Sequence, residues 1–376
     1  MRSFETYEYI KAIARAAIVV AALTFSVDFA TAGCGPFGNP PAEVNRGWFA
    51  TFASRHSPVC AGGRLVGPWK DADGDERNAC LYEPAYASRD KPLPLIVFLH
   101  PSVATADSIL LTGLTDLIDK ADLGGKQPGF ILLAPQGRYT SHFYPGFDSD
   151  GFGWDNWYRQ FGADAIATVE GTAYQENVDA SAIDHVVAEM VGSGKVDTRR
   201  IYLMGWSNGA AMALLYAMNR PWVAAAAVYS APDPLAALFD ICPQTPVSAS
   251  PSGYGQLRVM NPVVPMMHVR NACDIGGICP NGSRFASRVR TMGGNIEDVI
   301  LDSSGNLVAR CDETCGADEM ADGQVASGAA LRGLVHHMRW PRAWNENMLA
   351  FLMRHALPGG LDRRGVRNDS IATLAH

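Results

Sequence analysis

The residues Gly205-Trp206-Ser207-Asn208-Gly209 fit the pattern Gly-x-Ser-x-Gly, which is typical of a sharp strand-to-helix turn that exposes a serine nucleophile. A free serine hydroxyl is a weak nucleophile, so such a turn needs a histidine within reach and backbone N–H groups that stabilise an oxyanion. Glycine on either side leaves no side chain to collide with the neighbouring strand or helix. The pattern therefore predicts Ser207 as the nucleophile of an acyl transfer.

The general base is expected near the C-terminus. After a turn of this type, the acid and then the histidine follow the nucleophile along the chain. His336 and His337 come after the apolar run 331–335, which we expect to be the last strand of the sheet. We predict His337 as the base and keep its neighbour His336 as the alternative.

The acid is expected just after the end of a strand that follows Ser207. The run 263–269 has the character of a strand and leads into Asp274, whose carboxylate would accept the Nδ1–H of the histidine and stabilise the imidazolium. Asp233, which follows the preceding predicted strand, is the alternative.

The oxyanion hole requires two backbone N–H groups. The first is expected from Asn208, directly after the nucleophile. The second is expected from the loop after the strand that ends at His100, where Pro101 has no N–H to donate. This leaves Ser102 as the predicted second donor, with Val103 as the other possibility.

Two tryptophans are candidates for contact with the substrate. Trp206 lies beside the nucleophile and would line an acyl pocket, although an aromatic residue there also suits core packing. Trp154 belongs to the glycine- and aromatic-rich segment 143–177, which is either a lid or cleft wall or a small hydrophobic cluster under a long loop.

Short apolar runs bounded by Gly and Pro alternate with helix-forming segments, as in proteins with buried parallel strands. The expected strands span 95–100, 129–135, 200–204, 223–230 and 263–269, and the expected helices span 179–191, 210–220 and 344–355. This alternation predicts an α/β protein, with a mostly parallel central sheet covered by helices on both faces. Combined with the serine turn, it indicates the α/β-hydrolase fold.

Composition narrows the range of partners. The chain has 376 residues and a net charge of −7, and it has no basic run or stripe, which argues against nucleic acid as a partner. The chemistry predicted for Ser207 needs an ester-type substrate and no cofactor. The cysteine spacings and histidine positions do not form a zinc site, so no metal is expected. The sequence does not fix the oligomeric state.

The N-terminus has the layout of a secretory signal peptide. Basic residues precede an apolar run at 16–25, and Ala30-Thr31-Ala32 offers a cleavage site. No stretch is long enough for a transmembrane helix. We expect a signal peptide (1–32), an N-terminal extension (33–68), a catalytic domain (69–360) and a C-terminal tail (361–376), in a secreted or periplasmic protein. Lipidation of Cys34 is the alternative to a free mature N-terminus.

The eight cysteines form an even set, which predicts disulfides in an oxidising compartment, whereas lipidation of Cys34 would leave an odd number. The pairs closest in sequence are Cys60 with Cys80, Cys273 with Cys279, and Cys311 with Cys315. Spacing alone does not determine the pairing. A bond between Cys273 and Cys279 would stiffen the loop that carries Asp274.

The segment Val196–Met212 (VDTRRIYLMGWSNGAAM) resembles the strand and elbow of the secreted polyhydroxybutyrate depolymerase and feruloyl esterase group of α/β-hydrolases. The run 93–100 resembles that group's oxyanion strand, and Trp340-Pro341 resembles the Trp-Pro that follows its catalytic histidine. The resemblance extends over roughly 81–357 and is specific at the elbow. It implies a secreted serine esterase that hydrolyses hydroxyalkanoate oligomers or polymers, or related short-chain or aromatic esters, without a cofactor.

Two of the chain's departures from this group concern the predicted site residues. His100-Pro101 stands where the group has His-Gly, which leaves the second oxyanion donor open. His337 is one residue further from Trp340-Pro341 than the group's spacing, which leaves the choice between the adjacent histidines open. Two other functions fit the same residues: a serine peptidase or amidase of the same fold, and a catalytically silent binding protein.

Overall fold

The computed structural model describes residues 58–71, 74–140, 151–154, 159–160, 167–169, 172–175, 178–234, 239–240, 245–246, 263–275, 278–312, 315 and 328–358. The predicted signal peptide, Cys34 and the predicted C-terminal tail lie outside these residues, as does most of the segment 143–177.

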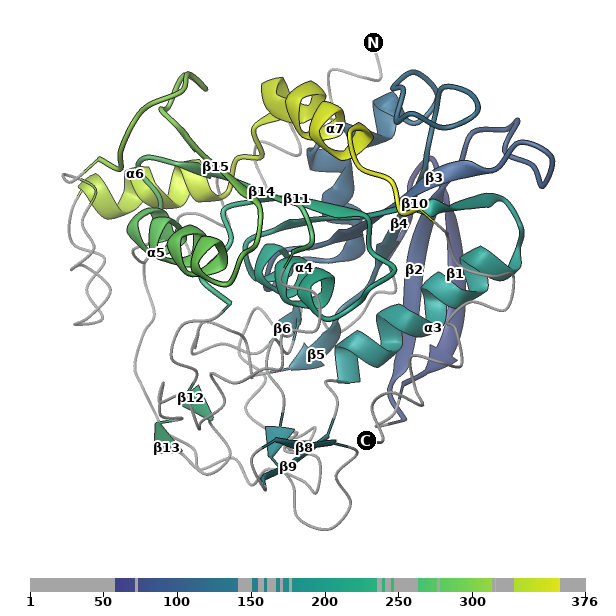
Figure 1. The fold of residues 1–376 in the computed structure, drawn as a ribbon, viewed down its shortest axis with the longest axis horizontal. Coiled ribbons are helices and arrows are strands. Elements are labelled where there is room, and N and C mark those ends of the chain that lie inside the picture. The colour runs from purple at the N-terminus through teal and green to yellow at the C-terminus, as the bar shows by residue number, and fades with distance from the viewer. Residues whose placement is uncertain are drawn as a thin grey trace.

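An eight-stranded sheet forms the centre of the described structure (Figure 1). Its strands, in spatial order, are β1 (Arg64–Lys70), β2 (Glu76–Tyr82), β4 (Ile131–Pro135), β3 (Leu93–Leu99), β10 (Val196–Trp206), β11 (Ala225–Tyr229), β14 (Met266–Asn271) and β15 (Ile296–Leu301). β2 is antiparallel to both of its neighbours. All the other pairs are parallel, so the carboxyl ends of β10, β11 and β14 meet at one edge of the sheet.

Helices cover both faces of this sheet (Figure 1). One face packs against α3 (Val178–Gly192), α4 (Asn208–Met218) and α5 (Ile278–Thr291), and the other against the 3₁₀ helices η1 (Ala106–Leu111) and η2 (Leu114–Leu117) and against α7 (Asn345–Met353). The remaining helices are α6 (Gly328–His337) and the 3₁₀ helix η4 (Arg342–Trp344). The smaller sheets consist of β5 (Arg138–Thr140) with β6 (Gly151–Gly153), β7 (Arg159–Gln160) and β8 (Ala167–Val169) with β9 (Thr172–Gln175), and β12 (Phe239–Asp240) with β13 (Thr245–Pro246).

Alternation along the central strands divides the core into two layers, because successive side chains of a strand point to opposite faces. On β10, Leu203 belongs to the layer that contains α3 and α4, whereas Tyr202 and Met204 belong to the layer that contains α7. With both faces covered, the strands read as continuous apolar runs. This architecture is the predicted α/β-hydrolase fold.

The predicted strands correspond to β3, β4, β10, β11 and β14, and the predicted helices to α3, α4 and α7. One prediction is wrong: the apolar run 331–335 is part of helix α6, and the last strand of the sheet is β15. β1 begins at Arg64, ahead of the boundary expected between residues 68 and 69.

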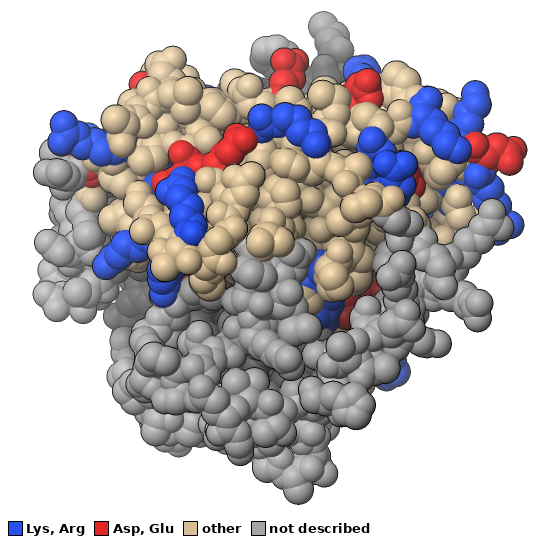
Figure 2. Space-filling model, in the orientation of Figure 1, with Lys and Arg blue, Asp and Glu red and all other residues tan. Residues whose placement is uncertain are grey.

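Two surface properties of the described residues bear on possible partners. No described helix combines the length and apolarity that crossing a membrane requires. On the face seen in Figure 2, the described lysines and arginines are scattered among uncharged and acidic residues and do not form a continuous patch.

Candidate active site

Ser207 occupies a sharp turn between the end of β10 and the start of α4. Its backbone has φ 55° and ψ −122°, a conformation that L-residues rarely adopt. The flanking glycines make this turn possible. A Cβ atom at Gly205 would overlap the backbone of Gly209, and one at Gly209 would overlap the carbonyl groups of Leu99 and His100. The steric reason predicted for both glycines is therefore confirmed.

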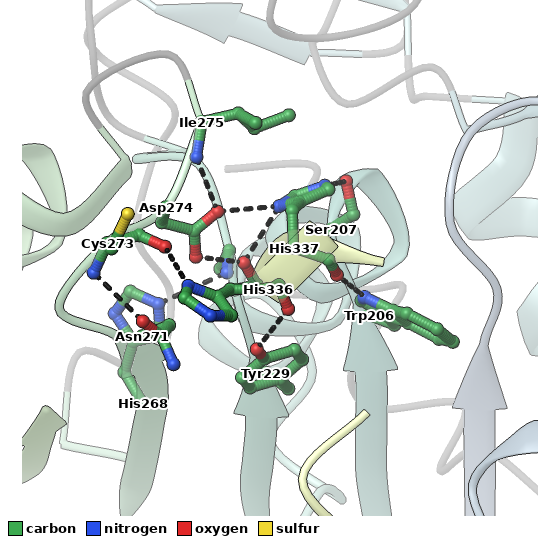
Figure 3. Close-up of polar contacts among 12 residues, drawn as sticks. Trp206, Ser207, Tyr229, His268, Asn271, Cys273, Asp274, Ile275, His336 and His337 are labelled. Atoms are coloured by element: carbon green, nitrogen blue, oxygen red, sulfur yellow. Dashed lines mark hydrogen bonds and ion pairs between the residues drawn. The ribbon is translucent and has the colours of Figure 1, made fainter. Parts of the chain in front are cut away.

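The structure brings Ser207, His337 and Asp274 together in one chain of contacts (Figure 3). The Oγ atom of Ser207 lies 2.8 Å from Nε2 of His337, and Nδ1 of the same ring lies 2.8 Å from Oδ1 of Asp274. The Asp274 carboxylate can only accept a hydrogen bond, so Nδ1 of His337 carries the ring proton and donates it to Asp274. Nε2 is then free of a proton and accepts from the Ser207 hydroxyl. The arrangement can transfer a proton from Ser207 to His337 and stabilise the resulting imidazolium.

Three separate elements deliver these side chains. Ser207 comes from the β10–α4 turn, Asp274 from the loop after β14, and His337 from the C-terminal end of α6. From the sequence, we expected the histidine to follow the last sheet strand. Instead, the chain leaves the sheet at β15 and returns to the site through a helix.

The structure does not bring the alternative candidates into this arrangement. Nδ1 of His336 lies 3.2 Å from the carbonyl oxygen of Cys273, so its ring packs against the loop beside Asp274. The carboxylate of Asp233 is paired with Arg288 of α5. The geometry thus favours His337 over His336 and Asp274 over Asp233.

Ser230 also contacts the triad, although it was not among the residues predicted from the sequence. It follows β11, its Oγ donates to Oδ2 of Asp274, and the same Oγ lies 2.9 Å from Nδ1 of His337. The sequence did hold a signal for this residue, because Ser230 ends the predicted strand 223–230, next to the strand that carries the nucleophile. Polar residues at carboxyl ends of neighbouring parallel strands meet at one edge of the sheet.

The oxyanion loop distinguishes between the two predicted second donors. The Val103 N–H already donates to the carbonyl oxygen of Phe152 at 2.7 Å. The Ser102 amide has no hydrogen-bond partner among the residues that the structure describes. Asn208 is the first residue of α4, and a helix N-terminus favours negative charge. Asn208 and Ser102 therefore remain the proposed donors.

Neither predicted substrate-binding tryptophan offers a face to a substrate, because Trp206 and Trp154 are each only 1% exposed. The Trp206 ring packs edge-on against Trp340, with ring centroids 5.9 Å apart. Trp206 is therefore a packing residue and does not line an acyl pocket as predicted. The burial of Trp154 likewise does not fit the lid or cleft wall expected there.

Residues Phe152 to Trp154 connect the oxyanion loop to the nucleophile turn. The Trp154 indole N–H donates to the carbonyl oxygen of His100 at 2.9 Å, while Phe152 accepts from Val103. On the other side, the backbone N–H of Trp154 donates to Asn208 Oδ1 at 2.8 Å, and Asn208 Nδ2 donates to the Trp154 carbonyl at 3.1 Å. We call residues 152–154 the bridging segment.

His100 holds the oxyanion loop in place through hydrogen bonds on both of its ring nitrogens. Its Nδ1–H donates to the Pro101 carbonyl at 2.8 Å, and its Nε2 accepts from the Gly137 N–H at 2.8 Å. These partners require a neutral ring. Burial lowers the pKa of His100 to about 4, which agrees with a neutral imidazole at this position.

Disulfides hold the loop that carries Asp274, but in a pairing different from that of nearest neighbours in sequence. Cys60 is bonded to Cys80, which is one of the three pairs closest in sequence, whereas Cys273 is bonded to Cys315 and Cys279 to Cys311. The expected stiffening of the acid loop by a Cys273–Cys279 bond is thus wrong. Cys273 in this loop and Cys279 at the start of α5 are instead joined to Cys315 and Cys311, beyond β15.

Among the described residues, one group of side chains has the spacing of metal ligands: Cys60, Cys80 and Asp107. Its two sulfurs are joined in a disulfide, so they supply no thiolates. Asp107 instead accepts the backbone N–H groups of Val59 and Cys60, each at 2.7 Å. The donor set therefore does not fit a metal ion.

No protein-family model matches the chain, and no curated protein matches its sequence. Solved structures match it at low identity. A thermostable esterase is 16% identical with a TM-score of 0.45, over 79% of this chain and 64% of that one, so this chain spans less than two thirds of its length. Esterase Est2 of Thermogutta terrifontis is 16% identical over 67% of this chain and 86% of that one, with a TM-score of 0.42.

An esterase of Pyrobaculum calidifontis is also 16% identical, over 65% of this chain and 78% of that one, with a TM-score of 0.42. Dipeptidyl peptidase 4 of Porphyromonas gingivalis is 13% identical over 64% of this chain and 32% of that one, with a TM-score of 0.39. At these values the activities of those proteins do not transfer to this chain.

Proposed function

We propose that this protein is a serine hydrolase that cleaves carboxylic esters through an acyl-enzyme. The observation that carries the proposal is the contact chain in which Ser207 Oγ lies 2.8 Å from His337 Nε2, while Asp274 accepts at Nδ1 of the same ring. Each contact is short enough for direct proton transfer or hydrogen bonding. The strained turn at Ser207 further supports a functional role, because such backbone conformations concentrate at active sites.

The proposed reaction proceeds in two acyl transfers. Ser207 Oγ bonds to the ester carbonyl carbon while its proton passes to His337 Nε2, and the carbonyl oxygen becomes an oxyanion held by the N–H groups of Asn208 and Ser102. The bond to the leaving oxygen then breaks, and Nε2 returns the proton to the departing alcohol. Water repeats the sequence on the acyl-enzyme and releases the acid, and no cofactor takes part.

The substrate class proposed is that of hydroxyalkanoate oligomers or polymers, or related short-chain or aromatic esters. It rests on the resemblance of the elbow segment to the depolymerase and feruloyl esterase group. We place the catalytic domain at 69–360 and propose export to the periplasm or the exterior through the signal peptide at 1–32. The three disulfides are consistent with an oxidising compartment.

A fluorophosphonate probe tests the proposed nucleophile, and turnover of p-nitrophenyl acetate, butyrate and ferulate-type esters tests the substrate class. Wild-type protein should react with the probe and turn over at least one ester, and Ser207→Ala should do neither. A folded wild-type protein that takes up no probe would overturn the proposal in favour of a binding protein.

Amide cleavage is measured alongside with the p-nitroanilide of the same acyl group. Triad geometry serves both esters and amides, so the leaving group separates the two activities. A kcat/KM for the anilide equal to that for the ester would replace the ester proposal with a peptidase or amidase.

A further inference from the structure

Ser230 holds an unusual backbone position beside the triad. It is fully buried and follows β11 directly, with φ 57°, in the left-handed region that costs a serine energy and glycine almost none. Its N–H donates to the Val269 carbonyl of β14 at 2.8 Å, which ties the end of β11 to its parallel neighbour. The backbone alone would be served better by glycine, so the hydroxyl is the feature that distinguishes this residue.

That hydroxyl closes a ring of hydrogen bonds. Its proton is donated to Oδ2 of Asp274, and its oxygen lies 2.9 Å from Nδ1 of His337. A hydroxyl has one donor and two acceptor sites, so it makes both bonds at once. The Nδ1–H therefore faces two acceptors, Oδ1 of Asp274 at 2.8 Å and Oγ of Ser230.

The carboxylate of Asp274 is satisfied on both oxygens. Oδ1 accepts from His337 and from the backbone N–H of Ile275 at 2.8 Å, and Oδ2 accepts from Ser230. Its side chain has no exposed surface, so its hydrogen-bond donors come from the protein itself. Without Ser230, Oδ2 would be a buried acceptor without a donor, and only the two bonds to Oδ1 would hold the carboxylate toward the imidazole.

We infer that Ser230 is a positioning residue for acyl transfer: it fixes the orientation of Asp274 and provides a second acceptor for the Nδ1 proton of His337. This inference rests on the proposed serine-hydrolase function. The second acceptor is needed most when the imidazole becomes an imidazolium, because the charged ring donates a stronger hydrogen bond. Ser230 thus acts on the rate of the chemical steps and not on the binding of substrate.

Ser230→Gly is the decisive variant, because it removes the hydroxyl and relieves the backbone strain. Ser108→Ala is the matched control: Ser108 is also buried, at 8% exposed, and its hydroxyl has no partner in the described structure. We expect kcat for a p-nitrophenyl ester to fall about tenfold to a hundredfold in Ser230→Gly at unchanged KM, the range for a hydrogen bond to a charged group. A kcat within twofold of wild type, in a folded variant, would overturn the inference.

A double-mutant cycle with Asp274→Ala tests the direct bond to His337. With the carboxylate gone, Ser230 is the remaining acceptor, so adding Ser230→Gly should lower the residual kcat again by about tenfold. If the double variant has the same kcat as Asp274→Ala, the second-acceptor role is wrong.

Proton NMR of the resting protein provides a readout that does not need turnover. The downfield His337 Nδ1–H resonance, assigned through its loss in His337→Gln, should move in Ser230→Gly and stay in place in Ser108→Ala. An unchanged resonance in Ser230→Gly would overturn the inference even if the protein had no esterase activity. Conversely, active wild type, inactive Ser207→Ala and normal Ser230→Gly would reject Ser230 alone and leave the proposed function standing.

Discussion

The indole N–H of Trp206 donates to the backbone carbonyl of His337 at 2.8 Å, so the residue before the proposed nucleophile holds the residue proposed as the base. The Tyr229 hydroxyl makes the equivalent bond to the carbonyl of His336 at 2.7 Å. Carbonyl groups in the last turn of a helix lack intrahelical partners. These two side chains, from the ends of β10 and β11, supply partners and fix the end of α6 to the sheet.

The adjacent histidines provide a matched pair of variants. His337→Ala removes the group that contacts Ser207, and we expect kcat to fall about 10³-fold or more. His336→Ala removes a ring whose one hydrogen-bond partner in the described structure is the Cys273 carbonyl. We therefore expect kcat to stay within a few fold of wild type. Steady-state rates on a p-nitrophenyl ester decide between them. Equal losses would mean that the helix end, not the His337 ring, is what matters.

The two aspartates make a second pair. Asp274→Asn should lower kcat by about 10³- to 10⁴-fold, since the amide favours the wrong tautomer of His337. Asp233→Asn breaks the ion pair between the buried Asp233 carboxylate and the partly exposed Arg288 side chain, so it should lower stability while kcat stays unchanged. Urea unfolding and kcat are measured on both. A normal kcat in Asp274→Asn would remove Asp274 from the proposed triad.

Removing the Cys273–Cys315 disulfide should affect activity differently from removing the Cys60–Cys80 disulfide. Cys273→Ser with Cys315→Ser loosens the loop that carries Asp274, so we expect lower kcat together with a loss of about 2–4 kcal/mol of stability. Cys60→Ser with Cys80→Ser should cost a comparable stability while the folded fraction keeps its kcat. Rates are compared below the unfolding transition of each variant. Unchanged kcat in the first variant would show that the loop holds its shape without the bond.

The neutral state of His100 makes stability depend on pH. Burial is the largest cause of its lowered pKa, and the nearby charges act in opposite directions, Asp179 raising it and Arg77 lowering it. Between pH 6.5, the ordinary pKa, and about 4, the unfolded chain binds a proton at His100 that the folded protein does not. The free energy of unfolding should therefore fall as pH falls through this window, by about 1.4 kcal/mol per pH unit from this group.

His100→Gln tests this dependence, because its side-chain oxygen can accept from the Gly137 N–H and does not titrate. Urea unfolding at pH 7 and pH 5 should show a smaller difference in free energy for the variant than for wild type. The free energy of unfolding should still depend on pH in the variant, since burial also lowers the pKa of His268 well below its ordinary value. Equal differences in the two proteins would contradict a protonation cost at His100.

The sequence predicts the position of Ser207 because the elbow is a local pattern whose glycines have a local steric reason. Asp274 follows from chain order and a strand end. The choice between His336 and His337 did not follow, since adjacent residues at a helix end point in different directions and only tertiary contacts decide which one meets Ser207. The five-residue run 331–335 is too short for its period to distinguish the observed helix from a buried strand.

Other features depend on contacts between distant residues. Ser230 and Asp274 are 44 positions apart, and their contact requires β11 and β14 to be neighbours. The sequence could not show whether Trp206 and Trp154 are buried in the core or contact the substrate, because large aromatic side chains serve both purposes. The disulfide pairing was open for the same reason: spacing does not reveal which loops meet in the fold.

The bridging segment has a consequence for anyone who redesigns this protein. Phe152 and Trp154 tie Val103 and His100 on one side to Asn208 on the other, so the two proposed oxyanion donors are set in position by a third piece of chain. Exchanging Trp154 would therefore displace the proposed oxyanion donors and weaken transition-state stabilisation. A library of variants made for new substrates should keep residues 152–154 constant. It should vary positions that make no hydrogen bond to the oxyanion loop or to Asn208.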